Sequence, residues 1–107
     1  MASFDDRENA FENKFAHDQD TLFKVTARRN KLLGHWAADK MGLTEEEKDA
    51  YGKAVVQADF EEAGDDDVLR KVLGDLTTAD VEADEAMVRS AMDDLMVEAR
   101  RQFIEEA

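Results

Sequence analysis

The chain of 107 residues contains no cysteine, no proline and only five glycines. Without cysteine there can be neither a disulfide framework nor a thiolate zinc site, and the chain fits a reducing compartment. No apolar run approaches the ~20 residues of a membrane span, and the start lacks the basic and apolar regions of a secretory signal. We therefore expect a cytoplasmic, single-domain protein whose core needs no covalent staple.

Basic residues are also scarce, with 14 Lys and Arg against 27 Asp and Glu, for a net charge of −13. Such a surface repels phosphate backbones and anionic lipids, so we expect neither nucleic-acid binding nor direct membrane insertion. Residues 21–38 are the exception, because they contain no carboxylate while Lys24, Arg28, Arg29 and Lys31 lie close together. The simpler interpretation is a helix face that complements acidic neighbours; the other is a secondary docking or nucleotide patch.

Strand signals are absent, and the composition favours helix throughout. The sequence predicts helices over 3–15, from about 20 to 41, from 45 to about 63, from 65 to 73, and from 77 or 78 to about 103. Gly42 suits the left-handed residue after a helix, Thr44 and Glu47 form a capping-box pattern, and Gly74 is predicted to end the fourth segment. Asp18 or Asp20 could cap the second helix, or the first helix could continue into it. We expect an all-α, single-domain, antiparallel bundle of about four helices.

Three of the six phenylalanines lie in the N-terminal segment. Phe4, Phe11 and Phe15 are separated by seven and four residues, so they share one stripe of a helix. Such a stripe either packs on the chain's own bundle or is buried in another protein, and chain ends are ordered only when something holds them. We therefore divide the chain into a partly independent N-terminal helical segment (residues 1–18) and a helical bundle (residues 19–107).

The residue patterns of catalysis and metal binding are missing. His17 and His35 lie far apart, and neither HExxH nor a Glu-x-x-His pair occurs. The acidic run at 65–67 lacks the spacing of a calcium loop and is better read as helix-start charge. No glycine-rich phosphate loop is present. We expect no enzyme, no metal and no cofactor, although weak ADP or ATP binding stays open.

Four stretches of the chain resemble one known family. They are FDDRE at 4–8, FENKFAHD at 11–18, ARRNKLLGHWAA at 27–38 and DFEEAGDDDVLRKV at 59–72. Their order and the chain length are similar to the ζ subunit, the ATPase inhibitor of α-proteobacterial F-type ATP synthases. Two positions depart from the pattern: His35 replaces an apolar residue before the tryptophan, and Ala63 replaces a common proline.

The resemblance implies a four-helix bundle whose N-terminal helix enters the catalytic head, at the nucleotide-binding subunits and the rotor, and blocks ATP hydrolysis. The partner-binding residues it implies are Phe4, Asp5, Asp6, Arg7, Glu8, Phe11 and Phe15. It also implies a monomer when free, associated with the cytoplasmic face of the membrane through the synthase. The alternative is a small nucleotide-sensing helical protein that binds ADP or ATP without catalysis.

Overall fold

The computed structural model describes residues 19–61 and 64–106, which form four helices and, within these ranges, no strand. They are α2 (Gln19–Met41), α3 (Glu45–Glu61), α4 (Asp65–Thr78) and α5 (Glu85–Glu106). The prediction of an all-α fold with about four helices is confirmed. The predicted helix over 3–15, the capping role of Asp18 and the substitution at Ala63 lie outside the described residues.

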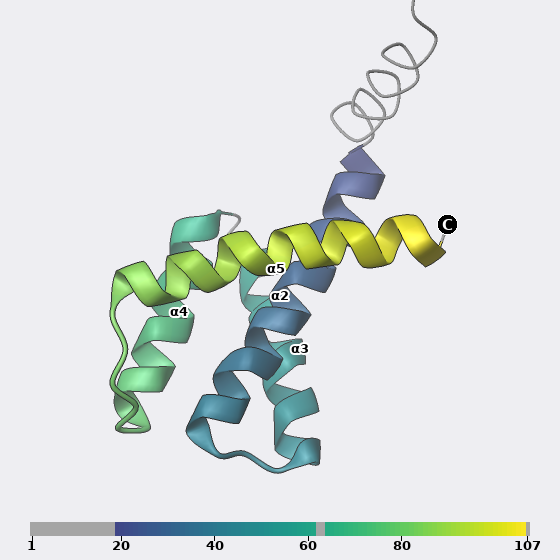
Figure 1. Ribbon diagram of the computed structural model, residues 1–107. Helices are drawn as coiled ribbons and strands as arrows, with labels where there is room; N and C mark the ends of the chain where they lie inside the picture. The colour runs from purple at the N-terminus through teal and green to yellow at the C-terminus, as the bar shows by residue number, and fades with distance from the viewer. Residues whose placement is uncertain (1–18, 62–63, 107) are drawn as a thin grey trace, which may run out of the picture.

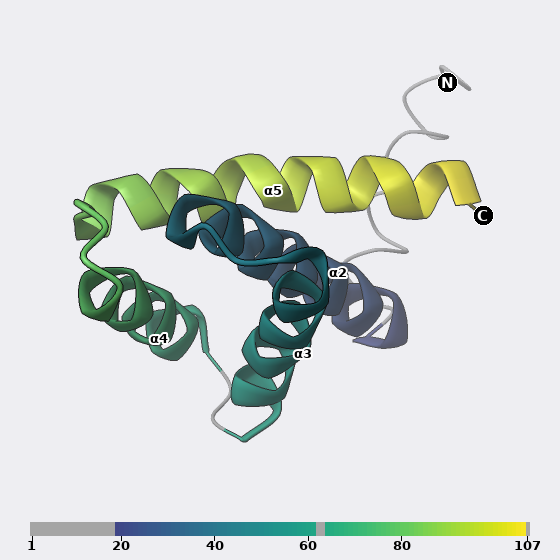
Figure 2. The same cartoon turned by 90° about the horizontal axis from the view of Figure 1, so that it is seen from below.

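The helices are arranged around α2, which contacts each of the other three. In Figure 1, α2 runs down the molecule, α3 returns beside it, and α4 runs down again, as expected of antiparallel neighbours. The last helix differs from the expected bundle, because α5 lies across α2 and α4 (Figures 1 and 2). Its 22 residues span about 33 Å, and lying across lets one helix cover both partners. Between the described parts of α3 and α5 there is no backbone contact, since α2 separates them.

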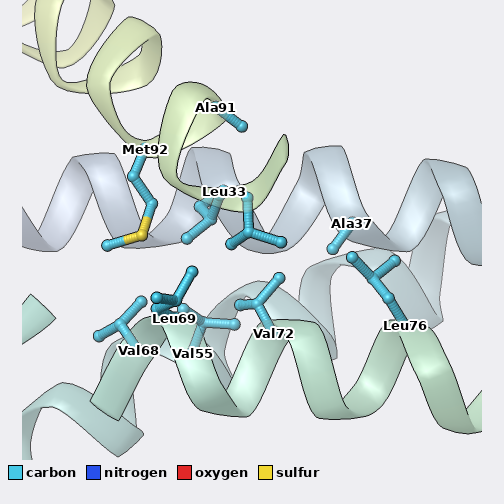
Figure 3. Packing of buried hydrophobic residues seen from close by; sticks show 10 residues of the cluster. Leu33, Ala37, Val55, Val68, Leu69, Val72, Leu76, Ala91 and Met92 are labelled. Atoms are coloured by element: carbon cyan, nitrogen blue, oxygen red, sulfur yellow. The ribbon is translucent and has the colours of Figure 1, made fainter. Parts of the chain in front are cut away.

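The hydrophobic core lies where these helices meet (Figure 3). It contains Leu33, Ala37, Val55, Val68, Leu69, Val72, Leu76, Val88, Ala91 and Met92. The shortest helix contributes most, because Val68, Leu69, Val72 and Leu76 of α4 are all buried. Each such Val or Leu side chain contributes about 1.5–3 kcal/mol relative to exposure.

Helices α2 and α3 approach each other closely at two glycines. A Cβ atom on Gly34 would lie 2.6 Å from the Cα of Gly52. Gly52 also leaves room for the imidazole ring of His35. A Cβ atom on Gly52 would lie only 3.0 Å from the His35 Cδ2 atom. The His35 Nε2 atom lies 3.3 Å from an Asp49 carboxylate oxygen, without a hydrogen bond. His35 therefore fits a position where the family resemblance suggests an apolar residue, because it packs on glycine.

The predicted turn between α2 and α3 is confirmed. Gly42 has a φ of 72°, in the left-handed region that follows many helices. The Thr44 backbone N–H donates to the Glu47 carboxylate at 2.9 Å, and the Glu47 backbone N–H donates to the Thr44 hydroxyl at 3.2 Å. These reciprocal bonds form the capping box. The hydrogen bond from the Thr44 backbone, and next that from the Thr44 side chain, lower the pKa of Glu47 because they stabilise the charged carboxylate.

Two predicted helix boundaries are wrong. Gly74 does not end α4, which continues to Thr78 because Leu76 is buried and holds the last turn on the core. Thr77 and Thr78 do not begin the last helix: they lie in the last turn of α4, where their hydroxyls donate to the carbonyls of residues 73 and 74 at 2.8 and 2.9 Å. The last helix begins at Glu85. The side chain of the preceding residue, Asp84, accepts a hydrogen bond from the backbone N–H of Met87 at 2.8 Å. Aspartate is a favoured capping residue, so Asp84 caps this helix in place of the predicted threonine.

Candidate partner-binding surface

The candidate residues of the N-terminal motif lie outside the described residues. They are Phe4, Asp5, Asp6, Arg7, Glu8, Phe11 and Phe15. The other candidates lie on α2, and their positions are described in full. Helical spacing places Lys24, Arg28 and Lys31 on one face, with steps of four and three residues, while Arg29 points toward the bundle.

Arg29 is a buried structural residue. Its side chain is only 2% exposed, and Nη2 donates to an Asp65 carboxylate oxygen at 2.8 Å. Its Nε donates to the side-chain oxygen of Asn30, which is itself fully buried, at 2.8 Å. Asp65 is the first residue of α4, where a carboxylate also suits the helix dipole. Arg29 therefore ties the middle of α2 to the start of α4 and is not available to a ligand.

Arg28 joins α2 to the end of α5. Its Nη2 lies 2.5 Å from a Glu106 carboxylate oxygen. The hydrogen bond to Glu106 raises the pKa of Arg28, and the same bond lowers the pKa of Glu106. Both shifts favour the charged forms, so the pair persists at neutral pH. Because Glu106 is exposed, the Arg28–Glu106 ion pair holds the end of α5 against α2 but adds little to the free energy of unfolding.

Lys24 and Lys31 are exposed, and neither takes part in an ion pair with another described residue. They are one helical turn to either side of Arg28. Lys53 and Arg100 likewise make no ion pair with another described residue, but they lie outside this basic cluster. Within the described chain Lys24 and Lys31 are the part of the basic cluster that is open to a partner.

These lysines border a groove between α2, α3 and α5, which we call the aromatic-basic groove. Its volume is about 590 Å³, and its lining residues are Phe23, Lys24, Ala27, Arg28, Lys31, Val56, Phe103 and Glu106. A smaller hollow of about 210 Å³ shares the Phe23, Ala27 and Val56 walls and extends to Phe60. The rim of the larger hollow carries three positive charges against one negative charge, and the smaller hollow is also lined by the polar side chains of Asn30 and Asp59.

Two aromatic side chains at the mouth of the groove remain open to solvent. Phe23 is 51% exposed and Phe60 is 57% exposed. Their rings contact each other edge to face, with centroids 5.0 Å apart, a favourable geometry for aromatic pairs. Phe23 was not among the residues predicted from the sequence. The available signal was its position two residues before the buried Val25, which places it on the opposite side of the helix.

Other classes of site find no support in the described part of the chain. No group of three or more His, Cys, Asp or Glu side chains there is placed to hold a metal ion. Nor does any described helix combine the length and the apolar character that crossing a membrane requires. What the structure does present is a small helical body with an apolar groove and a charged rim, the features of a surface that binds another macromolecule or segment. The described residues thus define a small all-α protein with an exposed apolar groove.

Comparison with known proteins identifies the family of this chain. The family model described as ATPase inhibitor subunit zeta matches residues 1–102, so the chain belongs to that family. The family indicates a regulatory, non-catalytic protein that interacts with an ATP synthase. The match includes the N-terminal motif as well as the bundle.

A solved structure supports the fold. A protein determined by solution NMR is 49% identical to this chain, and the match covers 79% of this chain and 96% of that one with a TM-score of 0.70. Among curated proteins, none matches the chain.

Proposed function

We propose that this protein inhibits ATP hydrolysis by an F-type ATP synthase by inserting its N-terminal helical segment (residues 1–18) into the catalytic head. The observation that carries the proposal is the family match, which begins at residue 1 and so includes the segment. The contacts would lie at the nucleotide-binding subunits and the rotor, and residues 19–107 would form the body that presents the segment. The protein would be cytoplasmic and would reach the membrane only through the synthase.

The chemistry of the segment suits insertion into a groove between subunits. Phe4, Phe11 and Phe15 could each contribute about 1.5–3 kcal/mol on burial, less the cost of ordering the segment. The charged residues at 5–8 would supply orientation and specificity around these apolar anchors. A helix bound in this way stabilises one rotational state of the motor, so the next catalytic step must overcome the binding energy. Inhibition is then mechanical and needs no catalytic residue.

The described part of the chain is consistent with a separate presenting body. Its buried core includes residues of all four described helices. The first turns of α2 extend beyond α5 and away from the core (Figure 1). There Leu22 and Phe23 are 43% and 51% exposed, so α2 leads off the bundle with apolar side chains that a partner could cover.

Deletion of residues 1–15 tests the proposal. The truncated protein should keep its helical circular dichroism and its melting temperature but should no longer inhibit ATP hydrolysis by the isolated catalytic head. Replacement of Phe4, Phe11 and Phe15 by alanine should have the same effect. A matched control replaces two exposed apolar residues of α5, Val97 (67% exposed) and Ile104 (45% exposed), by alanine, and it should inhibit like the intact chain. Inhibition by the truncated protein at the level of the intact chain would disprove the proposal.

Nucleotide binding without catalysis is the second candidate, and the aromatic-basic groove is the observation that favours it. A volume of about 590 Å³ lies within the range of ligand pockets, about 300–1,000 Å³. Phe23 and Phe103 could contact a base, while Lys24, Arg28 and Lys31 could contact phosphates. Titration with ADP, followed by NMR chemical shifts, should then move the amide signals of the groove, and unchanged shifts at millimolar ADP would exclude this function.

A further inference from the structure

The aromatic-basic groove combines a line of positive charge with exposed aromatic surface. We propose that it is the docking site for an acidic amphipathic helix of a partner protein. Carboxylates of that helix pair with the cations of α2, and its apolar side chains cover the exposed rings. Such a contact goes beyond the proposed function, because it involves only the helical body and does not depend on residues 1–18.

The positive charges of the groove lie in a line along α2. Lys24, Arg28 and Lys31 follow one another at steps of four and three residues, so they share one face of the helix over about 10 Å. Glu106 is the one acidic residue that lines the larger hollow, and it is paired with Arg28 at 2.5 Å. Because Lys24 and Lys31 make no ion pair with another described residue, the groove presents an excess of positive charge to a partner.

The sign and the short extent of this charge favour a compact acidic segment. Exposed charges interact over about 8 Å at physiological ionic strength, while the chain as a whole has a net charge of −13. An extended polyanion such as a nucleic acid would reach the acidic surface beyond the groove and be repelled. A helix that runs alongside α2 repeats its spacing, so carboxylates at matching steps of three and four residues meet the three cations.

Exposed aromatic surface lies beside these cations. Phe23 is 51% exposed and Phe60 is 57% exposed, and they are two of the five large apolar side chains that the described residues expose. Phe23 lines both hollows, and Phe60 lines the smaller one. Covering the two rings removes apolar surface from water, which favours association. The groove therefore suits an occupant with apolar as well as acidic side chains.

The size of the groove suits a single helix. Its two hollows have volumes of about 590 and 210 Å³, which is room for a few side chains rather than for a folded domain. An amphipathic helix presents such a small set of side chains on one face, as apolar residues three, four and seven positions apart that act as anchors in a hydrophobic groove. The carboxylates of the same helix then lie next to these anchors, as Lys24 and Lys31 lie next to Phe23.

Titration of the full-length, ¹⁵N-labelled protein with synthetic peptides tests the docking. The probe is a helical peptide of about 15 residues, long enough to form a helix in water, with glutamates and leucines on adjacent faces. The control peptide has lysine in place of each glutamate. The acidic peptide should shift the amide signals of Ala27 and Val56, which line both hollows, and should leave that of Leu76, outside the groove, unchanged. No shift at millimolar acidic peptide, or equal shifts with the lysine peptide, would overturn the proposal.

Two double variants with the same change in charge separate the groove from the rest of the surface. The Lys24→Ala, Lys31→Ala variant removes two cations of the rim. One exposed ion pair contributes about 1.4- to 5-fold, so this variant should raise the dissociation constant of the acidic peptide about 2- to 25-fold when the two contributions add. The Lys53→Ala, Arg100→Ala variant removes two exposed cations that do not line the groove, and it should leave the dissociation constant unchanged. Equal effects of the two variants would contradict docking in the groove.

A dilution series without peptide tests a second copy of the chain as the occupant. The amide signals of Ala27 and Val56 should not depend on protein concentration. Shifts that grow with concentration would assign the groove to self-association and overturn the proposal. None of these measurements uses the synthase, so a negative result here leaves the inhibition assay to decide the proposed function separately.

Discussion

Replacing Gly34 by alanine probes the contact that sets the distance between α2 and α3. The added Cβ would lie 2.6 Å from the Gly52 Cα, 3.1 Å from its backbone nitrogen and 3.3 Å from the Tyr51 carbonyl oxygen. All three are backbone atoms, so no side chain can rotate away. Favourable contacts between carbon atoms are about 3.5–4.0 Å long, so the two helices must separate by roughly 1 Å. That movement would loosen the buried Leu33 and Val55 beside it.

The expected change in the free energy of unfolding of Gly34→Ala is the balance of a steric cost and a gain in helix propensity. Overpacking of this kind costs about 1–3 kcal/mol, while alanine in place of glycine in a helix gains about 1 kcal/mol. Gly74 supplies the matched control, because it also lies within a helix but a Cβ there meets nothing within 4 Å. Gly74→Ala should therefore stabilise the protein by about 1 kcal/mol. The helix-propensity gain is common to both variants, so the difference between them measures the steric term alone.

Urea denaturation followed by circular dichroism gives both free energies of unfolding. The Gly34→Ala protein should be about 1–3 kcal/mol less stable than the Gly74→Ala protein. For a domain of this size, each kcal/mol corresponds to a difference of about 4–8 °C in melting temperature. If the two variants were equally stable, the close approach of α2 and α3 would not limit the packing, and the reasoning would be refuted.

Two further predictions concern side-chain hydrogen bonds that join different helices. Asp65→Ala should destabilise the protein by about 1.5–3 kcal/mol, because it leaves the buried Arg29 without its carboxylate, whereas Asp66→Ala, in the same exposed helix turn, should cost less than about 1 kcal/mol. Equal losses in urea denaturation would contradict the structural role of Arg29. Tyr51→Phe should cost about 1 kcal/mol at pH 7, because the Tyr51 hydroxyl donates to an Asp75 carboxylate oxygen at 2.7 Å.

The Tyr51 prediction has a definite pH dependence. Burial, and next the hydrogen bond to Asp75, raise the pKa of Tyr51 in the folded protein. The folded state thus favours the neutral phenol. The stabilisation of the folded protein by neutral Tyr51 is fully present below the pKa of tyrosine in the unfolded chain, about 10. It is progressively lost as the pH rises above that value, because the unfolded state then releases the proton more readily. The stability difference between the intact chain and Tyr51→Phe should narrow between pH 9 and pH 11. A constant difference over that range would show that Tyr51 ionises equally in both states.

Much of the fold was predictable because it depends on local chemistry. The capping box of Thr44 and Glu47 and the left-handed Gly42 involve residues within a few positions of each other, so the sequence pattern already contains the interaction. The acidic start of α4 is local in the same way. The two helix boundaries that were predicted wrongly depend on contacts between helices. Gly74 does not end α4 because Leu76 is buried against other helices, and helix propensity alone cannot predict that contact.

The sequence by itself determined the all-α class, the turn between α2 and α3, the acidic surface and the family to which the chain belongs. Only the tertiary structure decided which of four neighbouring basic side chains face solvent. Arg29 is buried and paired with a residue 36 positions away, Arg28 reaches the end of α5, and Lys24 and Lys31 remain open. Helical periodicity places these side chains around one helix, but burial depends on where α4 and α5 cross it, and that is set by packing between distant parts of the chain.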